Sequence, residues 1–396
     1  MRIEGFIQKM KEQFPWLLPG HEREELAALP LVTAGKLESH YYTDTNPLLH
    51  EPMNRYLTSG TSSKRRKTIF YSESDEEDYL RIKRDVFRTI LAGASYRTAM
   101  ADMGTGHAEA TAVEVFRELG MEVESVSFRL PIEEHIERLQ SFRPEVLYTM
   151  PSILDRIMQA SEHPGTYGIQ HVILVGEIAS PGWRQRTAER LGIAETQVTD
   201  TYGSIEIGTI AYFSHDHGRY LFAEGILAEG IQPELLDADL EPLPDVLEQV
   251  LVLTSTVRES FPALRYVTYD VVRDLKVIDV DGVPTQSFKS IVKRVGPDLK
   301  HGEKISIYDI EDVVYRHLRE ASVRVQVSGN ALTVHVYSAL ATPAVLNSIR
   351  EDVENHIPAI GMMIKAKLLD GIQVIGGTFE DSQNRTSVKN KKIFYT

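Results

Sequence analysis

The chain has 396 residues, enough for two or three domains, and its 42% hydrophobic and 25% charged residues are ordinary for a globular protein. Its formal net charge of −14 argues against nonspecific binding to nucleic acid or to an anionic membrane, since both attract basic surfaces. The sequence contains no cysteine, which excludes disulfides, a thiolate metal site and a cysteine nucleophile.

The N-terminal sequence MRIEGFIQKMKEQFPWLLPG alternates charged and apolar residues and lacks the continuous apolar core of a signal peptide. No stretch reaches the ~18 apolar residues that a membrane-spanning helix needs. We therefore expect a cytoplasmic enzyme with neither nucleic acid nor membrane as a partner, present as a monomer or homodimer.

In chain order, the first 55 residues predict short helices and loops, and a loop rich in Gly, Ser, Thr and Lys follows. Apolar residues then alternate between helical spacing and short β-prone runs. The predicted helices are 75–92, 110–120, 131–142, 151–163 and 181–192, and the predicted strands are 122–128, 145–150, 170–177 and 197–203. This alternation predicts a mostly parallel sheet flanked by helices.

After about Ile207 the pattern changes to hairpin-rich segments typical of an antiparallel subdomain, and the polar run 293–302 is a plausible hinge. Beyond the hinge we expect a small α+β domain, with helices at 308–320 and 342–357 and strands at 323–329, 331–338 and 364–370. The overall expectation is an α/β protein with a large domain, 1–293, and a small mobile C-terminal domain, 294–396.

The segment Thr58-Ser59-Gly60-Thr61-Ser62-Ser63-Lys64-Arg65-Arg66-Lys67 has the composition of an anion-binding loop. Small residues let backbone N–H groups turn towards phosphate, hydroxyls donate hydrogen bonds, and the cations neutralise charge. It is not a P-loop, because no second Gly precedes the Lys. A solvated turn is an equally good interpretation of this segment by itself.

Three further segments bear residues suited to nucleotide chemistry. Tyr202-Gly203-Ser204-Ile205-Glu206 follows a strand, where an aromatic face can stack on a purine and a carboxylate can hold Mg²⁺. Asp270, after Tyr266-Val267-Thr268-Tyr269, could accept hydrogen bonds from a ribose diol. The basic segment around Lys389 lies near the C-terminus. Each alone also fits a strand end, a turn or a solvated tail.

Together and in this order, the four segments resemble the adenylate-forming superfamily of acyl-CoA synthetases, adenylation domains and luciferases. Thr58–Lys67 is similar to its phosphate loop, Tyr202–Glu206 to its Y-G-x-T-E motif, and Tyr266–Asp270 to its Y-x-T-x-D motif. Arg294 and Glu311 fall in its hinge block, and Lys389 at its final lysine.

The phenylacetate–CoA ligase-like branch is the most similar. Gly104-Thr105-Gly106-His107 resembles that branch's G-x-G-x-H, and Tyr148-Thr149-Met150-Pro151-Ser152 resembles its strand-to-helix turn beside the acyl pocket. Val175-Gly176-Glu177 is similar to the G-G-E or G-A-E of the whole superfamily. The chain departs from the family at Ile205, where a Thr is usual, and at Val388, where a Gly is usual, so Lys391 or Lys392 could replace Lys389.

The resemblance implies an enzyme that uses ATP and Mg²⁺ to convert a carboxylic acid to acyl-AMP and then transfers the acyl group to a thiol. It implies ATP binding by Thr58, Ser59, Gly60, Thr61, Ser62, Lys67, Tyr202, Gly203, Asp270 and Arg294, acid binding by His107, Tyr148, Pro151, Gly176 and Glu177, a Mg²⁺ ligand in Glu206 and catalysis by Lys389. The expected acid is aromatic, with secondary metabolism as the setting, and the acceptor is coenzyme A or an acyl carrier protein. The alternative is a non-catalytic nucleotide-binding relative that acts as a scaffold or regulator.

Overall fold

The computed structural model describes residues 3–17, 25–57, 67–103, 106–236, 240, 242–243, 245–295, 307–319, 321–328, 330–365, 369–377 and 393–395. The chain divides into two compact units. The first comprises Met1–Arg97, Thr105–Val123 and Thr201–Gly296, and the second comprises Thr98–Gly104, Glu124–Asp200 and Pro297–Thr396.

In the first unit, short helices precede one long helix, as predicted. The helices are α1 (Ile3–Gln13), α2 (Ala34–His40), α3 (Glu73–Ile90) and α4 (His107–Glu118), with short 3₁₀ turns at Leu26–Ala28, Pro47–His50 and Pro233–Leu235. Helix α3 begins with a capping box in which the Ser72 hydroxyl accepts from Asp75 N and the Asp75 carboxylate accepts from Ser72 N. Its apolar face, with Ile82, Val86 and Phe87, is buried.

The strands of the first unit are antiparallel, and the hairpin-rich sequence pattern predicted this for the strands after Ile207. They are β1 (Asn54–Leu57), β2 (Thr68–Tyr71), β8 (Gly208–Ser214), β9 (Arg219–Phe222), β10 (Ile226–Ile231), β11 (Glu248–Ser255), β12 (Tyr266–Arg273), β13 (Lys276–Val280), β14 (Val283–Phe288) and β15 (Ser290–Arg294). Strands β10, β11, β12 and β15 form one sheet in that order. Strands β8, β9, β14 and β13 are neighbours in another.

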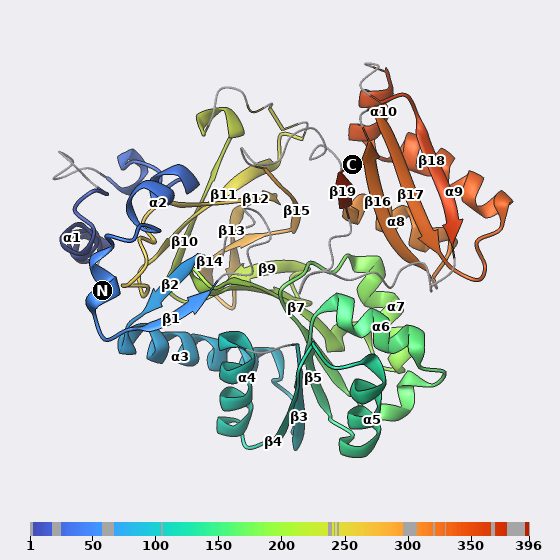
Figure 1. The fold of residues 1–396 in the computed structure, drawn as a ribbon, viewed down its shortest axis with the longest axis horizontal. Helices are drawn as coiled ribbons and strands as arrows, with labels where there is room; N and C mark the ends of the chain where they lie inside the picture. The colour runs from blue at the N-terminus through green and yellow to red at the C-terminus, as the bar shows by residue number, and fades with distance from the viewer. Residues whose placement is uncertain are drawn as a thin grey trace. The chain divides into compact units, whose positions relative to one another are not determined.

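The second unit contains the predicted parallel strands with their helices. These are α5 (Ile132–Phe142), β5 (Val146–Thr149), α6 (Pro151–Ala160), β6 (His171–Leu174) and α7 (Pro181–Leu191), with 3₁₀ turns at Pro164–Tyr167 and Glu195–Gln197. A further parallel strand, β3 (Thr98–Asp102), pairs with β5 and was not predicted. Strands β4 (Glu122–Val126) and β7 (Val198–Ser204) begin in one unit and end in the other. In Figure 1, α5, α6 and α7 lie together beside the parallel strands, and Leu147, Val172 and Trp183 belong to the buried core there.

The C-terminal residues form the expected α+β pattern. Its elements are α8 (Ile307–His317), β16 (Ser322–Ser328), β17 (Ala331–Tyr337), α9 (Pro343–His356), α10 (Pro358–Lys365), β18 (Ile372–Gly377) and β19 (Ile393–Tyr395). The strands form one sheet in the order β18-β17-β16-β19, with α9 packed against β18.

One predicted element of this region was wrong. A strand was expected at 364–370, but α10 extends to Lys365 and the strand begins at Ile372. A short apolar run such as 358–365 fits a buried helix as well as a strand. Pro358, whose fixed φ suits the first helical position, starts the helix.

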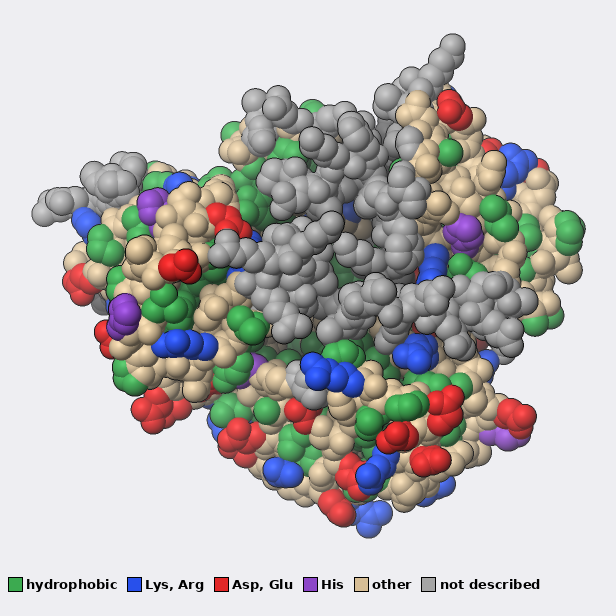
Figure 2. Space-filling view, in the orientation of Figure 1, with side chains coloured by type: hydrophobic (Ala, Val, Ile, Leu, Met, Phe, Trp, Pro, Cys, Tyr) green, Lys and Arg blue, Asp and Glu red, His purple; other side chains and the backbone are tan. Residues whose placement is uncertain are grey.

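Acidic and basic side chains are interspersed over the described surface that Figure 2 displays. Among the described residues, no helix combines the length and the apolar character needed to cross a membrane.

Candidate active site

Two residues predicted to bind the nucleotide are in direct contact in the first unit. The Tyr202 hydroxyl, near the end of β7, donates to Asp270 Oδ2 in β12 at 2.6 Å. Burial, followed by the nearby Asp270 charge, raises the pKa of Tyr202 well above its ordinary value, so the hydroxyl remains a donor at neutral pH. The contact orients the Asp270 carboxylate.

Gly203 follows Tyr202 where β7 turns into β8. A Cβ atom on Gly203 would lie 2.7 Å from the backbone oxygen of Gly208, a distance that real side chains do not tolerate. The register between the two strands also shifts between Tyr202 and Gly203. Glycine at position 203 therefore permits the close backbone approach that shapes this turn.

Asp270 lies at a bulge in β12. The pairing of β11 with β12 is regular on both sides of Thr268–Asp270 and shifts between them, and Tyr269 has a positive φ of 63°. The Thr268 hydroxyl donates to Leu251 O at 2.8 Å and accepts from Asp270 N at 3.0 Å, so it satisfies backbone groups that the bulge leaves unpaired. Bulges of this kind re-aim side chains beside functional sites.

Arg294 lies opposite Asp270 on the neighbouring strand β15. Its Nε is 4.0 Å from Asp270 Oδ1, and its Nη2 donates to Thr268 O at 3.3 Å. The Asp270 charge, opposed by burial, raises the pKa of Arg294. The structure thus brings Tyr202, Asp270 and Arg294 together, as the sequence predicted for a nucleotide site.

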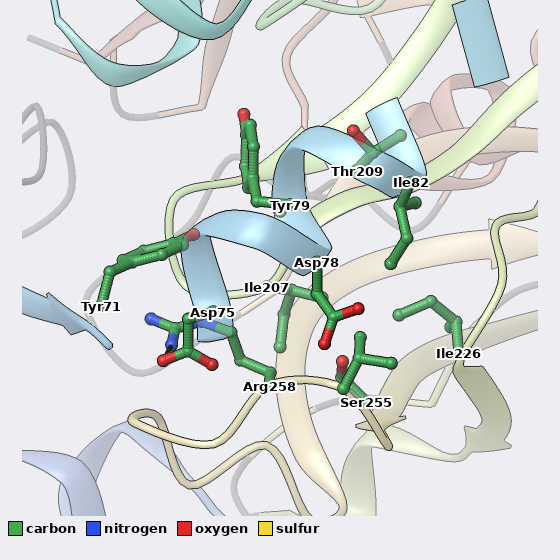
Figure 3. Close-up of a pocket in the computed structure, with 12 residues that line it drawn as sticks. Tyr71, Asp75, Asp78, Tyr79, Ile82, Ile207, Thr209, Ile226, Ser255 and Arg258 are labelled. Carbon is green, nitrogen blue, oxygen red and sulfur yellow. Dashed lines mark hydrogen bonds and ion pairs between the residues drawn. The ribbon is translucent and has the colours of Figure 1, made fainter. Parts of the chain in front are cut away.

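The loop that carries Glu206 is held through its backbone. The Tyr71 hydroxyl donates to Ile205 O at 2.8 Å, and Arg258 Nε donates to Glu206 O at 3.1 Å. Figure 3 shows Tyr71 and Arg258 lining one side of a small pocket next to α3, with Ile207 also in its wall. These two hydrogen bonds fix the backbone of the loop at Ile205 and Glu206.

A buried ion pair supports this arrangement. Arg258 pairs with Asp75, whose carboxylate also accepts from Glu259 N at 2.7 Å and from Ser260 N at 3.0 Å. The Arg258 guanidinium lies 3.7 Å from the centre of the Tyr71 ring and donates to Phe70 O at 2.6 Å. Sequence reasoning missed both charged residues, because an acidic residue in the first turn of a helix is ordinary and no local pattern indicates a role for Arg258.

Glu206 suits the predicted role of a Mg²⁺ ligand. Among the described residues its carboxylate makes no hydrogen bond or ion pair, and it is only partly buried. Mg²⁺ prefers one or two carboxylates together with substrate phosphates, so a single uncommitted carboxylate fits the ion. No group of three potential metal ligands occurs in the described part of the chain.

The predicted acid-binding residues of the second unit lie around the start of α6. Glu177 accepts from Ser152 N at 2.8 Å and from the Ser152 hydroxyl at 2.9 Å, so its carboxylate caps that helix. Pro151 is the first residue of α6, and Gly176 has a positive φ of 78° beside Met150. Tyr148 is buried in β5.

His107, also predicted to bind the acid, is buried at the start of α4 in the first unit. Its Nε2 lies 2.6 Å from Glu76 Oε2, and Glu76 Oε1 also accepts from the Tyr56 hydroxyl at 2.7 Å. Tyr56 and Tyr79 pack against the imidazole with ring centres 4.2 and 4.3 Å away. Glu76 was not singled out from the sequence, because an acidic residue in a first helical turn is ordinary.

Several predicted residues lie outside the described part of the chain, namely Thr58, Ser59, Gly60, Thr61, Ser62 and Lys389, with the alternatives Lys391 and Lys392. Lys67 is described: its Nζ is 2.5 Å from Glu38 Oε1 and 4.8 Å from the centre of the Tyr42 ring.

Comparison with known proteins gives a consistent result. The sequence pattern of AMP-binding enzymes matches residues 119–249, and that of the fumarate–diaminopropanoate ligase C-terminal domain matches residues 300–380. The chain is 35% identical over 379 residues to a fumarate–(S)-2,3-diaminopropanoate ligase from Enterobacter agglomerans, and the matched region covers 94% of each protein. It is 28% identical to a phenylacetate–coenzyme A ligase from Thermus thermophilus, over 62% of this chain and 56% of that enzyme.

Solved structures show the same fold. A 2-hydroxyisobutyryl-CoA ligase in the postadenylation state matches with a TM-score of 0.75 and 14% identity, covering 100% of this chain and 88% of the other. An amide bond synthetase from Marinactinospora thermotolerans matches with a TM-score of 0.54 and 15% identity, covering 85% and 67%. The chain belongs to the adenylate-forming, AMP-binding enzyme family and is a ligase that activates a carboxylic acid with ATP.

Proposed function

We propose that this ligase joins a small dicarboxylic acid such as fumarate to an amine such as 2,3-diaminopropanoate. The observation that carries the proposal is the 35% identity to a fumarate–(S)-2,3-diaminopropanoate ligase across 94% of both chains. The match of residues 300–380 to the C-terminal domain of such ligases agrees with it. The product is then an amide, and the predicted thiol acceptor is replaced by an amine.

The reaction has two steps. A carboxylate oxygen of the acid attacks the α-phosphorus of ATP, a P–O bond forms, and pyrophosphate leaves. The neutral amine nitrogen then attacks the carbonyl carbon of acyl-AMP, a C–N bond forms, the bond from the carbonyl carbon to the AMP oxygen breaks, AMP leaves, and the nitrogen loses one proton. The substrates supply the nucleophiles in both steps, so the protein contributes mainly positioning and charge stabilisation.

In this proposal Asp270 accepts hydrogen bonds from the ribose hydroxyls, with its carboxylate oriented by Tyr202. Arg294, beside Asp270, adds positive charge near the nucleotide. Glu206 would hold Mg²⁺, which supplies charge neutralisation at the phosphates when bound. Residues 58–62 with Lys67 bind the outer phosphates, and Lys389, on a mobile domain of residues 294–396, serves adenylation. Tyr148, Pro151, Gly176, Glu177 and His107 are proposed to contribute to acid binding.

The second candidate keeps the original prediction of an aromatic acid and coenzyme A as acceptor. It is favoured by the 28% identity to a phenylacetate–coenzyme A ligase, although this chain spans 56% of that enzyme. A carrier-protein acceptor, a role in secondary metabolism, a cytoplasmic location and a monomeric or homodimeric state remain predictions.

Two assays on the purified protein separate the candidates. ATP–pyrophosphate exchange with fumarate, succinate, benzoate and phenylacetate identifies the acid. Product formation with 2,3-diaminopropanoate, with its mono-amine analogue alanine, and with coenzyme A is then followed by mass spectrometry. We expect exchange with a dicarboxylate and an amide product. Exchange restricted to aryl acids, with a thioester product, would instead establish the second candidate.

A further inference from the structure

A short N-terminal segment, residues 25–34, lies against the strand that carries Asp270. We call it the strap. Val32 forms a parallel β-bridge with Tyr266: Val32 N donates to Arg265 O and Val267 N donates to Val32 O, both at 3.0 Å. At the end of the strap, Ala34 N donates to the Tyr269 hydroxyl at 3.0 Å. The strap therefore contacts β12 at both ends of the Tyr266–Asp270 motif.

Two residues here have unusual backbone conformations, Arg265 directly before the motif and Tyr269 within it. Arg265 has φ of 49° and Tyr269 has φ of 63°, although neither is glycine. Residues in this left-handed region are strained and persist only where the surroundings hold them. Asp270 follows the second strained residue directly, so its direction depends on whether that conformation is kept.

The strap supplies contacts that hold both residues. The Arg265 guanidinium donates to Ala27 O at 2.6 Å and to Leu29 O, both in the strap, and its Nε pairs with Glu229 Oε2 at 3.0 Å. Tyr269 is held at its hydroxyl by Ala34 N and at its backbone oxygen by Val295 N, at 2.8 Å. Each strained residue thus has a side-chain anchor in the strap.

We propose that the strap is a positioning element for nucleotide binding, acting through Tyr269 and Arg265 to aim the Asp270 carboxylate at the ribose. The inference rests on the ribose-binding role proposed for Asp270. Tyr269 and Arg265 touch no substrate in this scheme. They keep the β12 bulge in the one conformation in which Asp270 meets the Tyr202 hydroxyl and faces Arg294.

The test measures the coupling between the strap and the ribose hydroxyls. Dissociation constants for ATP and for 2′,3′-dideoxy-ATP are measured by titration calorimetry on the full chain, so the assay does not depend on the acid. Tyr269→Phe removes the hydroxyl that accepts from the strap. Ala34→Pro removes the N–H on the other side: proline suits the first helical position, and Thr33 already has the extended conformation that proline requires before it. Tyr212→Phe, a half-buried tyrosine on β8, is the control for loss of a hydroxyl.

We expect Tyr269→Phe and Ala34→Pro each to weaken ATP binding about tenfold, the effect of losing one well-placed hydrogen bond. Binding of dideoxy-ATP should change less than about twofold, because the Asp270–ribose contact is already missing. The double variant, Tyr269→Phe with Ala34→Pro, should bind ATP no more weakly than the weaker-binding of the two single variants. Tyr212→Phe should bind both nucleotides with wild-type affinity.

If the strap variants bind ATP and dideoxy-ATP more weakly by the same factor, the strap has only a structural role and the proposal is wrong. Wild-type ATP affinity in both variants would also overturn the proposal. Asp270→Ala distinguishes this failure from failure of the underlying assignment. If Asp270→Ala weakens ATP binding no more than it weakens dideoxy-ATP binding, Asp270 does not bind the ribose, and both the assignment and the strap proposal are wrong. If Asp270→Ala weakens ATP binding selectively and the strap variants do not, the strap proposal alone is wrong.

Discussion

Replacing Asp75 by Asn should both destabilise the first unit and impair adenylation. Asp75 is buried and accepts from Arg258, Glu259 N and Ser260 N, besides capping α3. The substitution keeps the shape but leaves the fully buried Arg258 guanidinium without a counter-charge. Removing one partner of a buried pair costs about 3–5 kcal/mol, and we expect a value near the lower end because the amide oxygen still accepts.

The matched control is Asp78→Asn, one turn further along α3. Asp78 pairs with Arg81 at 2.9 Å, but both side chains are about one-third exposed, so its loss should cost less than about 1 kcal/mol. Both variants are compared with wild type by equilibrium urea unfolding and by ATP–pyrophosphate exchange. Asp75→Asn should also lose most of its exchange activity, because Arg258 donates to Glu206 O.

A double variant, Asp75→Asn with Arg258→Met, completes the cycle. It removes both charges, so its loss of stability should be clearly smaller than the sum of the two single losses. If Asp75→Asn unfolds at the same urea concentration as Asp78→Asn, or if the two losses simply add, the buried pair does not stabilise this unit as argued.

The remaining predictions concern four positions. Burial lowers the pKa of Lys83 to about 7 from 10.5, so between these pH values the unfolded chain binds one proton more than the folded chain. The stability of wild type relative to Lys83→Met should therefore rise from pH 7 to pH 10, by up to about 1.4 kcal/mol per pH unit. A stability difference in urea unfolding that does not change with pH would refute this. Gly203→Ala should reduce exchange at least tenfold, since its Cβ would meet backbone 2.7 Å away; wild-type exchange would show that the turn adapts freely. Glu206→Gln should lose exchange activity at limiting Mg²⁺, and full retention would remove Glu206 as a ligand. Lys389→Ala should form acyl-AMP about 10²–10³ times more slowly than wild type, yet still transfer the acyl group from supplied acyl-AMP. If Lys389→Ala adenylates normally, Lys391→Ala and Lys392→Ala test the neighbouring lysines.

Much of the architecture was predictable because its signals are local. The alternation of apolar strands with amphipathic helices between 122 and 203 follows from periods of two and 3.6 residues, and these elements form as expected. The order of short motifs indicated the adenylate-forming family, which the relatives confirm. The local signal failed at 364–370, because helix α10 extends to Lys365 and the next strand begins only at Ile372.

The sequence by itself thus determined the fold class and the family, and it predicted the types of residue that would bind the nucleotide. Only the tertiary structure decided which groups meet: Tyr202 with Asp270, 68 positions apart, and Asp75 with Arg258, 183 positions apart. It also decided that Arg265 and Tyr269 take strained conformations held by the strap. Such contacts depend on how strands and helices far apart in the sequence pack together. Neither hydrophobic periodicity nor motif spacing indicates which distant residue a side chain will hydrogen-bond.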